Sequence, residues 1–255
     1  KPTVENTVLL LPSYGKFAVP ILLLNIERGI AFEATISSLK MIKGYGEAGE
    51  VMDKLIETTR VVFDREYKQK VFDGSRINSV VNYIKALRLL GQDEGKSVKK
   101  SLYGLLEDGL SRIQKFEDIE AEIKLVAEET TLALIALSFE REAIKILLLC
   151  QDADLFNDRM IEVLRLAEEK MGTSKFRSDF LFSANEIIEE TSKNLQEEKL
   201  GTQPIKNILY VLSVFFQNNN EPACELLNDA KVKLKSATNI IKEIDLTLKE
   251  LECKS

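Results

Sequence analysis

Histidine and tryptophan are both missing from this chain of 255 residues, and cysteine and proline are scarce, with three and five residues. Histidine is the usual general base near neutral pH and the commonest metal ligand. Its absence excludes Ser-His-Asp and Cys-His catalysis and every histidine-ligated zinc, iron or haem site. Catalysis would have to rely on carboxylate, Lys, Tyr or Cys side chains alone. We therefore predict that the protein is not an enzyme and that it holds no cofactor and no metal.

The three cysteines, Cys150, Cys224 and Cys253, are an odd number without Cys-x-x-Cys spacing. This pattern fits reduced thiols better than a disulfide framework or a thiolate zinc site. It predicts a reducing, cytoplasmic location.

Positive charge and long apolar runs are also limited. The formal net charge of −6 argues against a nucleic-acid partner, because affinity for phosphates comes mainly from clustered Lys and Arg. The longest runs without a charge span about ten residues each, where a transmembrane helix needs roughly 20. The sequence therefore predicts no transmembrane segment, although peripheral contact with a membrane or lipid stays compatible with it. Two lysine clusters lack interleaved aromatic residues and are expected to be solvated surfaces; they are Lys96, Lys99, Lys100 and Lys231, Lys233, Lys235.

What the sequence has in abundance is apolar residues at helical spacing. They recur at three- and four-residue steps along most of the chain, which contains 45% hydrophobic residues and only 12 Gly. No segment keeps the strict alternation of a β-strand. The pattern predicts an all-α protein, either a single multi-helix bundle or an irregular α-solenoid, with about eight to nine helices.

Pro2, Pro12 and Gly15 surround a short apolar run at the start of the chain. Because proline and glycine interrupt helices, residues 1–15 are expected to form an extended arm. Residues 16–255 are expected to form one helical domain, whose weakest internal boundary lies near residues 171–174. A long helix that is apolar on most sides, from about residue 118 to 150, is expected at the centre of that domain, with a kink or break near Phe139-Glu140.

The clearest pattern is at the C-terminus. Pro222 suits a first helical position, and nine apolar residues then alternate steps of four and three: Ala223, Leu227, Ala230, Leu234, Ala237, Ile241, Ile244, Leu248 and Leu251. The spacing predicts one long heptad-patterned helix. Because Leu226 and Ile240 widen the stripe, we expect it to pack into its own domain, with an intermolecular coiled coil as the alternative.

Three groups of residues resemble functional motifs in letters only. Gly44-x-Gly46-x-x-Gly49 matches a dinucleotide fingerprint, but a helical pattern precedes it where a strand should stand. Asp152, Asp154 and Asp158 lack the central Gly and final Glu of a calcium loop, and helix capping explains them. The neighbouring carboxylates of Glu128-Glu129 and of Glu186, Glu189 and Glu190 are expected to be solvated.

The surplus of apolar surface is the main functional indication. It predicts a non-enzymatic helical interaction or adaptor domain, which binds a partner protein through an apolar groove or helix face. The candidate surface residues are Val8, Leu9, Leu10, Leu11, Leu226 and Ile240. The alternative is a lipid- or membrane-interacting helical protein, either a hydrophobic-ligand carrier or an α-helical pore former. A homo-oligomer is compatible with either reading.

Overall fold

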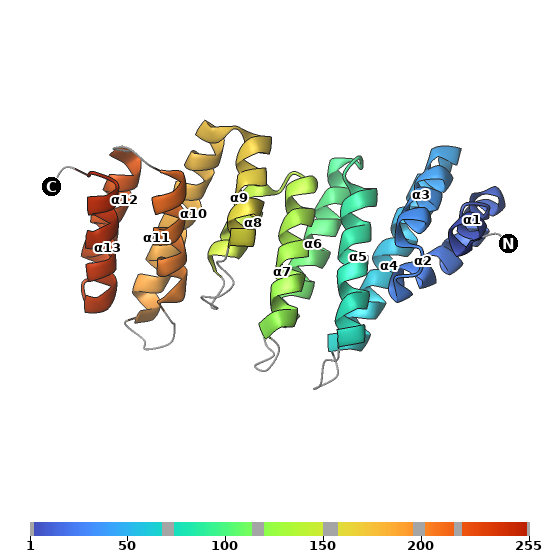
Figure 1. Cartoon of the computed structure of the whole chain (residues 1–255), viewed down its shortest axis with the longest axis horizontal. Helices are drawn as coiled ribbons and strands as arrows, with labels where there is room; N and C mark the ends of the chain where they lie inside the picture. Colours follow the sequence, from blue (N-terminus) through green and yellow to red (C-terminus); the bar gives the residue numbers. More distant parts are fainter. Residues whose placement is uncertain are drawn as a thin grey trace. The chain divides into compact units, whose positions relative to one another are not determined.

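A computed structural model of the chain describes residues 3–67, 74–113, 120–149, 158–195, 202–216 and 221–253. All regular elements within these ranges are helices, which confirms the all-α prediction (Figure 1). The helices in the described ranges outnumber the eight or nine that the sequence predicts. The chain divides into two compact units, residues 1–139 and residues 140–255. This division differs from the predicted single domain with a weak point near residues 171–174, which lie inside the second unit.

The first unit consists of α-helices with two short irregular helical turns, a 3₁₀ segment (η1) and a π segment (η2). Their bounds are α1 Val4–Val8, η1 Leu11–Ala18, α2 Val19–Arg28, α3 Phe32–Ile42, η2 Lys43–Glu47, α4 Ala48–Tyr67, α5 Gly74–Gly91, α6 Lys96–Ile113 and α7 Glu120–Ala136. The second unit follows the same all-helical plan. Its helices are α8 Glu140–Leu148, α9 Asp158–Met171, α10 Thr173–Leu195, α11 Gln203–Phe215, α12 Glu221–Lys233 and α13 Thr238–Glu250.

The predicted extended arm is wrong for the residues that the structure describes, because they are helical. The Thr3 side chain caps α1 by accepting a hydrogen bond from the Asn6 backbone N–H at 3.3 Å. Pro12 lies in the first turn of η1, where a missing N–H leaves no hydrogen bond unmade. The Ser38 hydroxyl donates to the Val8 carbonyl at 3.1 Å and so attaches α1 to α3. Proline here starts a helical turn instead of preventing one.

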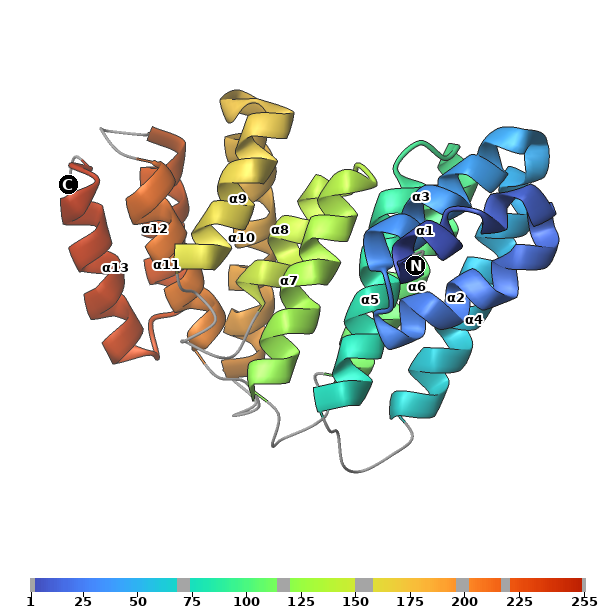
Figure 2. The same ribbon diagram turned by 45° about the vertical axis from the view of Figure 1, so that its right-hand side comes forward.

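Helix α5, and not the predicted segment 118–150, is central to the first unit. It packs against α2, α3, α4, α6 and α7, and Figure 2 shows it between α7 and the pair α2 and α4. Its buried side chains include Val80, Tyr83 and Leu87. The break predicted near Phe139-Glu140 is confirmed: α7 ends at Ala136, Ser138 adopts a φ of 72°, and α8 begins at Glu140, in the second unit.

The single long C-terminal helix is also wrong, because α12 ends at Lys233 and α13 begins at Thr238. The two helices form an antiparallel hairpin in which Lys231 pairs with Asp245 at 2.6 Å. A tight turn can preserve a three- or four-residue step between apolar residues, so the periodicity does not reveal the break. After the turn the buried positions become Ile240, Ile244, Thr247 and Leu251.

A disulfide closes the open end of this hairpin. Cys224, near the start of α12, is bonded to Cys253, just after α13, with 5.6 Å between their Cα atoms. The prediction of reduced thiols is therefore wrong for these two cysteines, and the predicted cytoplasmic location loses the observation on which it depended. The sequence could not pair them, because only the turn between α12 and α13 brings residues 29 positions apart into contact.

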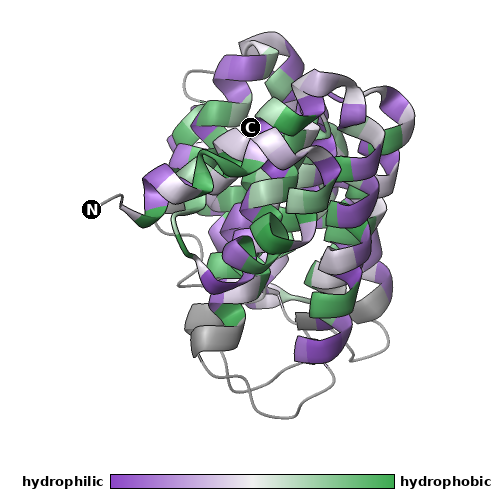
Figure 3. Cartoon of the chain, turned by 90° about the vertical axis from the view of Figure 1, so that its right-hand side faces the viewer, coloured by the Kyte–Doolittle hydropathy of each residue, from purple (hydrophilic) through white to green (hydrophobic). Residues whose placement is uncertain are grey.

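Hydrophobic and hydrophilic residues alternate along most helices, as expected for amphipathic helices that each bury one face (Figure 3). Among the described residues, no helix combines the length and the apolar character that a bilayer crossing requires.

Candidate interaction groove

Exposed apolar side chains concentrate in the first unit. Of the sixteen large apolar side chains exposed in the described ranges, eleven lie between residues 4 and 61. Isolated exposed apolar residues are ordinary, whereas a cluster of them marks a contact surface. The eleven are Val4, Leu9, Leu10, Tyr14, Phe17, Ile21, Leu24, Ile30, Met41, Tyr45 and Val61.

Helix α2 supplies one wall of a groove within this region. Its sequence is apolar on nearly every side, so burying Leu22, Leu23 and Ile26 still leaves apolar residues facing outward. Pro20 and Leu24, one turn apart on the outer side, line the groove. Gly29 ends the helix in a left-handed conformation (φ 65°), and its N–H bonds back to Ile26.

Helix α4 supplies the opposite wall. Four of its residues line the groove at positions i, i+3, i+4 and i+7, which places them on one face of the helix. They are Lys54, Glu57, Thr58 and Val61. The other face of α4 buries Leu55 and Val62 in the core, while the Val61 side chain stays 57% exposed.

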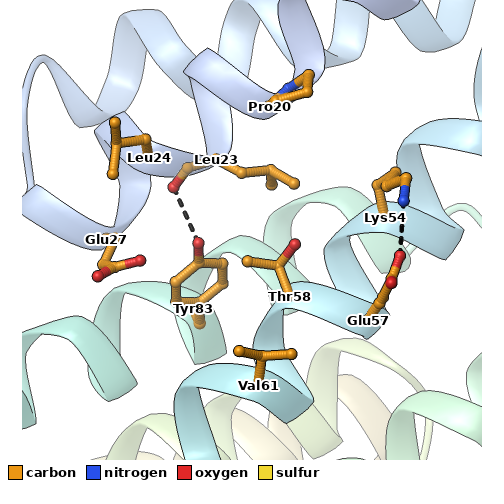
Figure 4. Close-up of a pocket in the computed structure, with 9 residues that line it drawn as sticks. All are labelled: Pro20, Leu23, Leu24, Glu27, Lys54, Glu57, Thr58, Val61 and Tyr83. Carbon is orange, nitrogen blue, oxygen red and sulfur yellow. Dashed lines mark hydrogen bonds and ion pairs between the residues drawn. The ribbon is translucent and has the colours of Figure 1, made fainter. Parts of the chain in front are cut away.

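Tyr83 of α5 and Leu23 of α2 complete the lining of the groove (Figure 4). The Tyr83 hydroxyl donates a hydrogen bond to the Leu23 carbonyl at 2.9 Å, and both side chains are buried. Burial raises the pKa of Tyr83 above the usual value for tyrosine. The groove has a volume of about 380 Å³.

The charged side chains of the groove are paired with each other or with neighbours. Lys54 donates to Glu57 at 2.7 Å, and this hydrogen bond raises the pKa of Lys54 and lowers that of Glu57. Glu27 pairs with Arg65 at 3.0 Å, and Arg65 also bonds Glu66. The charged side chains of the groove are therefore already paired within the protein. The exposed apolar side chains of its walls are the part that a partner could cover.

None of the six residues predicted to form an interaction surface lines this groove. Val8, Leu226 and Ile240 are at most 9% exposed and cannot present a surface in the folded chain. Leu9 and Leu10 are exposed next to α1, and Leu11 is half-buried. Leu9, Leu10 and Leu11 belong to the first unit, whereas Leu226 and Ile240 are buried within the second.

Sequence reasoning missed Leu24 and Val61 as surface residues. Leu24 stands in the run Ile21-Leu22-Leu23-Leu24, in which every side of the helix is apolar and periodicity cannot choose a buried face. Val61 did carry a signal, because it lies outside the three- and four-residue steps that join Leu55 to Val62. An apolar residue off the core face of a regular helix is a candidate contact residue.

The motif-like groups have structural roles where they are described. Gly44, Gly46 and Gly49 lie in and after the turn η2 between two helices, without the strand that a dinucleotide site requires. Glu129 lies 3.6 Å from Lys85 and 3.5 Å from Arg88 across α5 and α7. Asp152 and Asp154 fall outside the described residues, within which no cluster could hold a metal ion.

Two further carboxylates of the second unit are also ion-paired. Glu186 pairs with Lys145 at 3.1 Å. Glu189 pairs with Lys233 at 3.2 Å, and the hydrogen bond from Lys233 lowers the pKa of Glu189. Both glutamate side chains are still about half exposed, so they are solvated as expected and in addition form surface ion pairs between helices.

Comparison of the chain with protein-family models, with curated proteins and with solved structures finds no match in any of the three.

Proposed function

We propose that the protein is a non-enzymatic helical interaction protein that receives an amphipathic helix of a partner protein in the groove between α2 and α4. The observation that carries this proposal is the pair of outward apolar residues, Leu24 at 42% and Val61 at 57% exposure, on opposite walls of one groove. Neither residue contributes to the core, and both cost solvation free energy while they face water.

The shape and chemistry of the groove favour a helix over a small polar ligand. A small ligand needs convergent polar groups that fix its orientation, and here the charged groups are engaged in pairs. A helix placed along the groove would contact Leu24 and Val61 with residues at i, i+3, i+4 and i+7. Phe17 of η1 and Ile21 of α2 are further exposed apolar residues of the same segment.

The test compares two double variants that add the same charge. Leu24→Asp/Val61→Asp places carboxylates in the groove, whereas Val232→Asp/Leu246→Asp changes exposed apolar residues of the second unit, which face water even more fully. A photo-reactive residue at position 61, and separately at 232, first identifies proteins that contact each surface. We expect a partner that crosslinks only from position 61 and whose Kd rises at least tenfold in the groove variant, about 1.4 kcal/mol.

Equal binding by the groove variant and the parent chain would contradict the proposal, as would equal loss in the control variant. Sedimentation of the parent chain tests whether a second copy of this chain occupies the groove. A dimer that the groove substitutions dissociate would identify a second copy of this chain as the occupant and would overturn a separate partner protein.

A further inference from the structure

A second cavity of the first unit lies at the end of α7, away from the α2–α4 groove, and has a volume of about 630 Å³. Its lining comes from the turn after α7 and from the beginning of α6. The two sites share no lining residue. A volume between about 300 and 1,000 Å³ is typical of small-molecule sites in proteins.

The inner lining of this cavity is apolar and partly aromatic. Leu137 is 1% exposed, and the rings of Tyr103 and Phe139 pack with their centroids 5.0 Å apart. The Tyr103 hydroxyl donates to Glu107 at 3.0 Å, and Glu107 is not part of the lining. The polar end of Tyr103 is thus satisfied elsewhere, and its ring contributes apolar surface.

Three lysines, Lys96, Lys99 and Lys100, also line this cavity. None of them has an ion-pair partner in the described part of the chain. The acidic residue at the cavity, Glu94, is already paired with Lys43 at 2.5 Å. Three lysines without an ion-pair partner among the described residues therefore line one cavity of a chain whose net charge is −6, and Lys100 also lines a neighbouring pocket that contains Asp64 and Asp108.

Folding gives no evident reason for this arrangement. Lys96 is separated from Lys99 by three positions and from Lys100 by four, so the three like charges share one face of α6 and Lys96 repels the other two. An anion bound among them would reverse that repulsion. The adjacent apolar lining requires that the anion also carry an apolar part.

We propose that this cavity binds an amphiphilic anion, whose apolar chain lies against Tyr103, Leu137 and Phe139 and whose carboxylate or phosphate group is held by the lysines. Ammonium groups bind either head group through charge-assisted hydrogen bonds, so the lysines recognise the shared negative charge. Each methylene that enters the apolar lining strengthens binding, because apolar surface is removed from water. The site is independent of the proposed helix-binding groove.

Binding to the full chain can be measured by calorimetry with four probes, the two amphiphiles kept below their micellar concentrations and dodecanol below its solubility limit. Dodecanoate and dodecyl phosphate supply both parts of the ligand, dodecanol supplies the chain alone, and inorganic phosphate supplies the charge alone. We expect saturable binding of one molecule of dodecanoate or dodecyl phosphate, and at least tenfold weaker binding of the other two probes. Whichever of the two amphiphiles binds more tightly identifies the head group as a carboxylate or a phosphate.

Two triple variants separate the site from the overall charge of the chain. Lys96→Gln/Lys99→Gln/Lys100→Gln should weaken amphiphile binding at least tenfold. Lys235→Gln/Lys242→Gln/Lys249→Gln removes the same charge from the second unit and should leave binding within twofold of the parent. Circular dichroism confirms that both variants fold; if the first does not, Phe139→Ala, which should weaken binding at least threefold, replaces it.

Absence of saturable binding would overturn the proposal. Equal affinity for dodecanol and dodecanoate would also overturn it, because the lysines would then play no part. An equal loss of binding in the two triple variants would attribute the effect to net charge instead of to this cavity.

Discussion

Two glycines of α6 differ in what surrounds them. A Cβ at Gly109 would overlap the ring of Phe63, which is buried on α4, whereas a Cβ at Gly104 would meet no atom within 4 Å. Gly109 therefore allows α4 and α6 to approach closely, while Gly104 has only the conformational cost of glycine in a helix. The same residue type has opposite roles five positions apart.

This contrast gives a matched prediction. Gly109→Ala should lower the free energy of unfolding by about 1 to 3 kcal/mol, because the added methyl overpacks the α4–α6 contact. Gly104→Ala should raise it by about 0.5 to 1 kcal/mol, because alanine has the higher helix propensity. Urea unfolding followed by circular dichroism measures both. If Gly109→Ala is as stable as Gly104→Ala, the close contact with Phe63 does not exist in solution.

Tyr83 gives a pH-dependent prediction at the same scale. Burial raises its pKa in the folded chain, so between pH 10 and that raised value the folded state keeps a proton that the unfolded state has lost. Stability should be complete below about pH 10 and should fall as the pH rises, by up to about 1.4 kcal/mol per pH unit for this residue. Urea titrations between pH 9 and pH 11 measure the slope.

The variant Tyr83→Phe has no phenol to ionise, so its unfolding free energy should fall less steeply than that of the parent chain above pH 10. It should also be about 1 kcal/mol less stable at pH 8, because the hydrogen bond to Leu23 is lost. Tyr14→Phe is the control, since the Tyr14 side chain is 66% exposed. If the unfolding free energy of Tyr83→Phe falls with pH as steeply as that of the parent chain, Tyr83 is not buried in solution.

At the scale of the element, the α12–α13 hairpin depends on a turn at one end and a disulfide at the other. The disulfide closes a loop of about 30 residues, for which loop entropy predicts a stabilisation of roughly 3 to 4 kcal/mol. Cys224→Ser, or addition of reductant, should lower the unfolding free energy of the second unit by about that amount. Thermal unfolding with and without dithiothreitol measures the change.

Thiol counting checks the pairing directly. The denatured, unreduced chain should react as one free thiol, and the reduced chain as three. Cys150→Ser keeps the Cys224–Cys253 pair and should respond to reductant as the parent chain does. Three free thiols before reduction would show that the pair does not form in the isolated protein.

At the scale of the whole molecule, the chain consists of two units that each contain a core. Buried residues of the first include Leu22, Leu55 and Leu87, and those of the second include Phe180 and Leu212. Separate cores predict separate folding. Residues 1–139 and residues 140–255, expressed as individual chains, should each give a helical circular dichroism spectrum and a cooperative thermal transition.

Cutting the chain elsewhere provides the control for this prediction. A division between residues 171 and 172 separates α9 from α10, which pack against each other in the second unit. The resulting fragment 172–255 should unfold with less cooperativity than 140–255. If both fragments of the 171/172 division fold as well as those of the 139/140 division, the observed boundary has no energetic meaning.

The sequence by itself determined that the protein is all-α and that its amphipathic helices bury one apolar face. Both properties follow from the local spacing of apolar residues, which any helix reports within its own sequence. The predicted helix boundaries were wrong where one local sequence pattern is compatible with two structures. Pro12 suggests an interrupted helix but lies in the first turn of η1, and the apolar steps from Leu234 to Ile241 continue through a turn.

Only the tertiary structure decided which apolar residues stay exposed. Leu24 and Val61 line one groove because α2 and α4 both pack on α5, and Cys224 meets Cys253 because α13 folds back on α12. Such contacts join residues far apart in the chain, so no periodicity within a single helix records them. The candidate groove and the disulfide therefore depend on how the helices pack against one another, which the sequence pattern of a single helix does not contain.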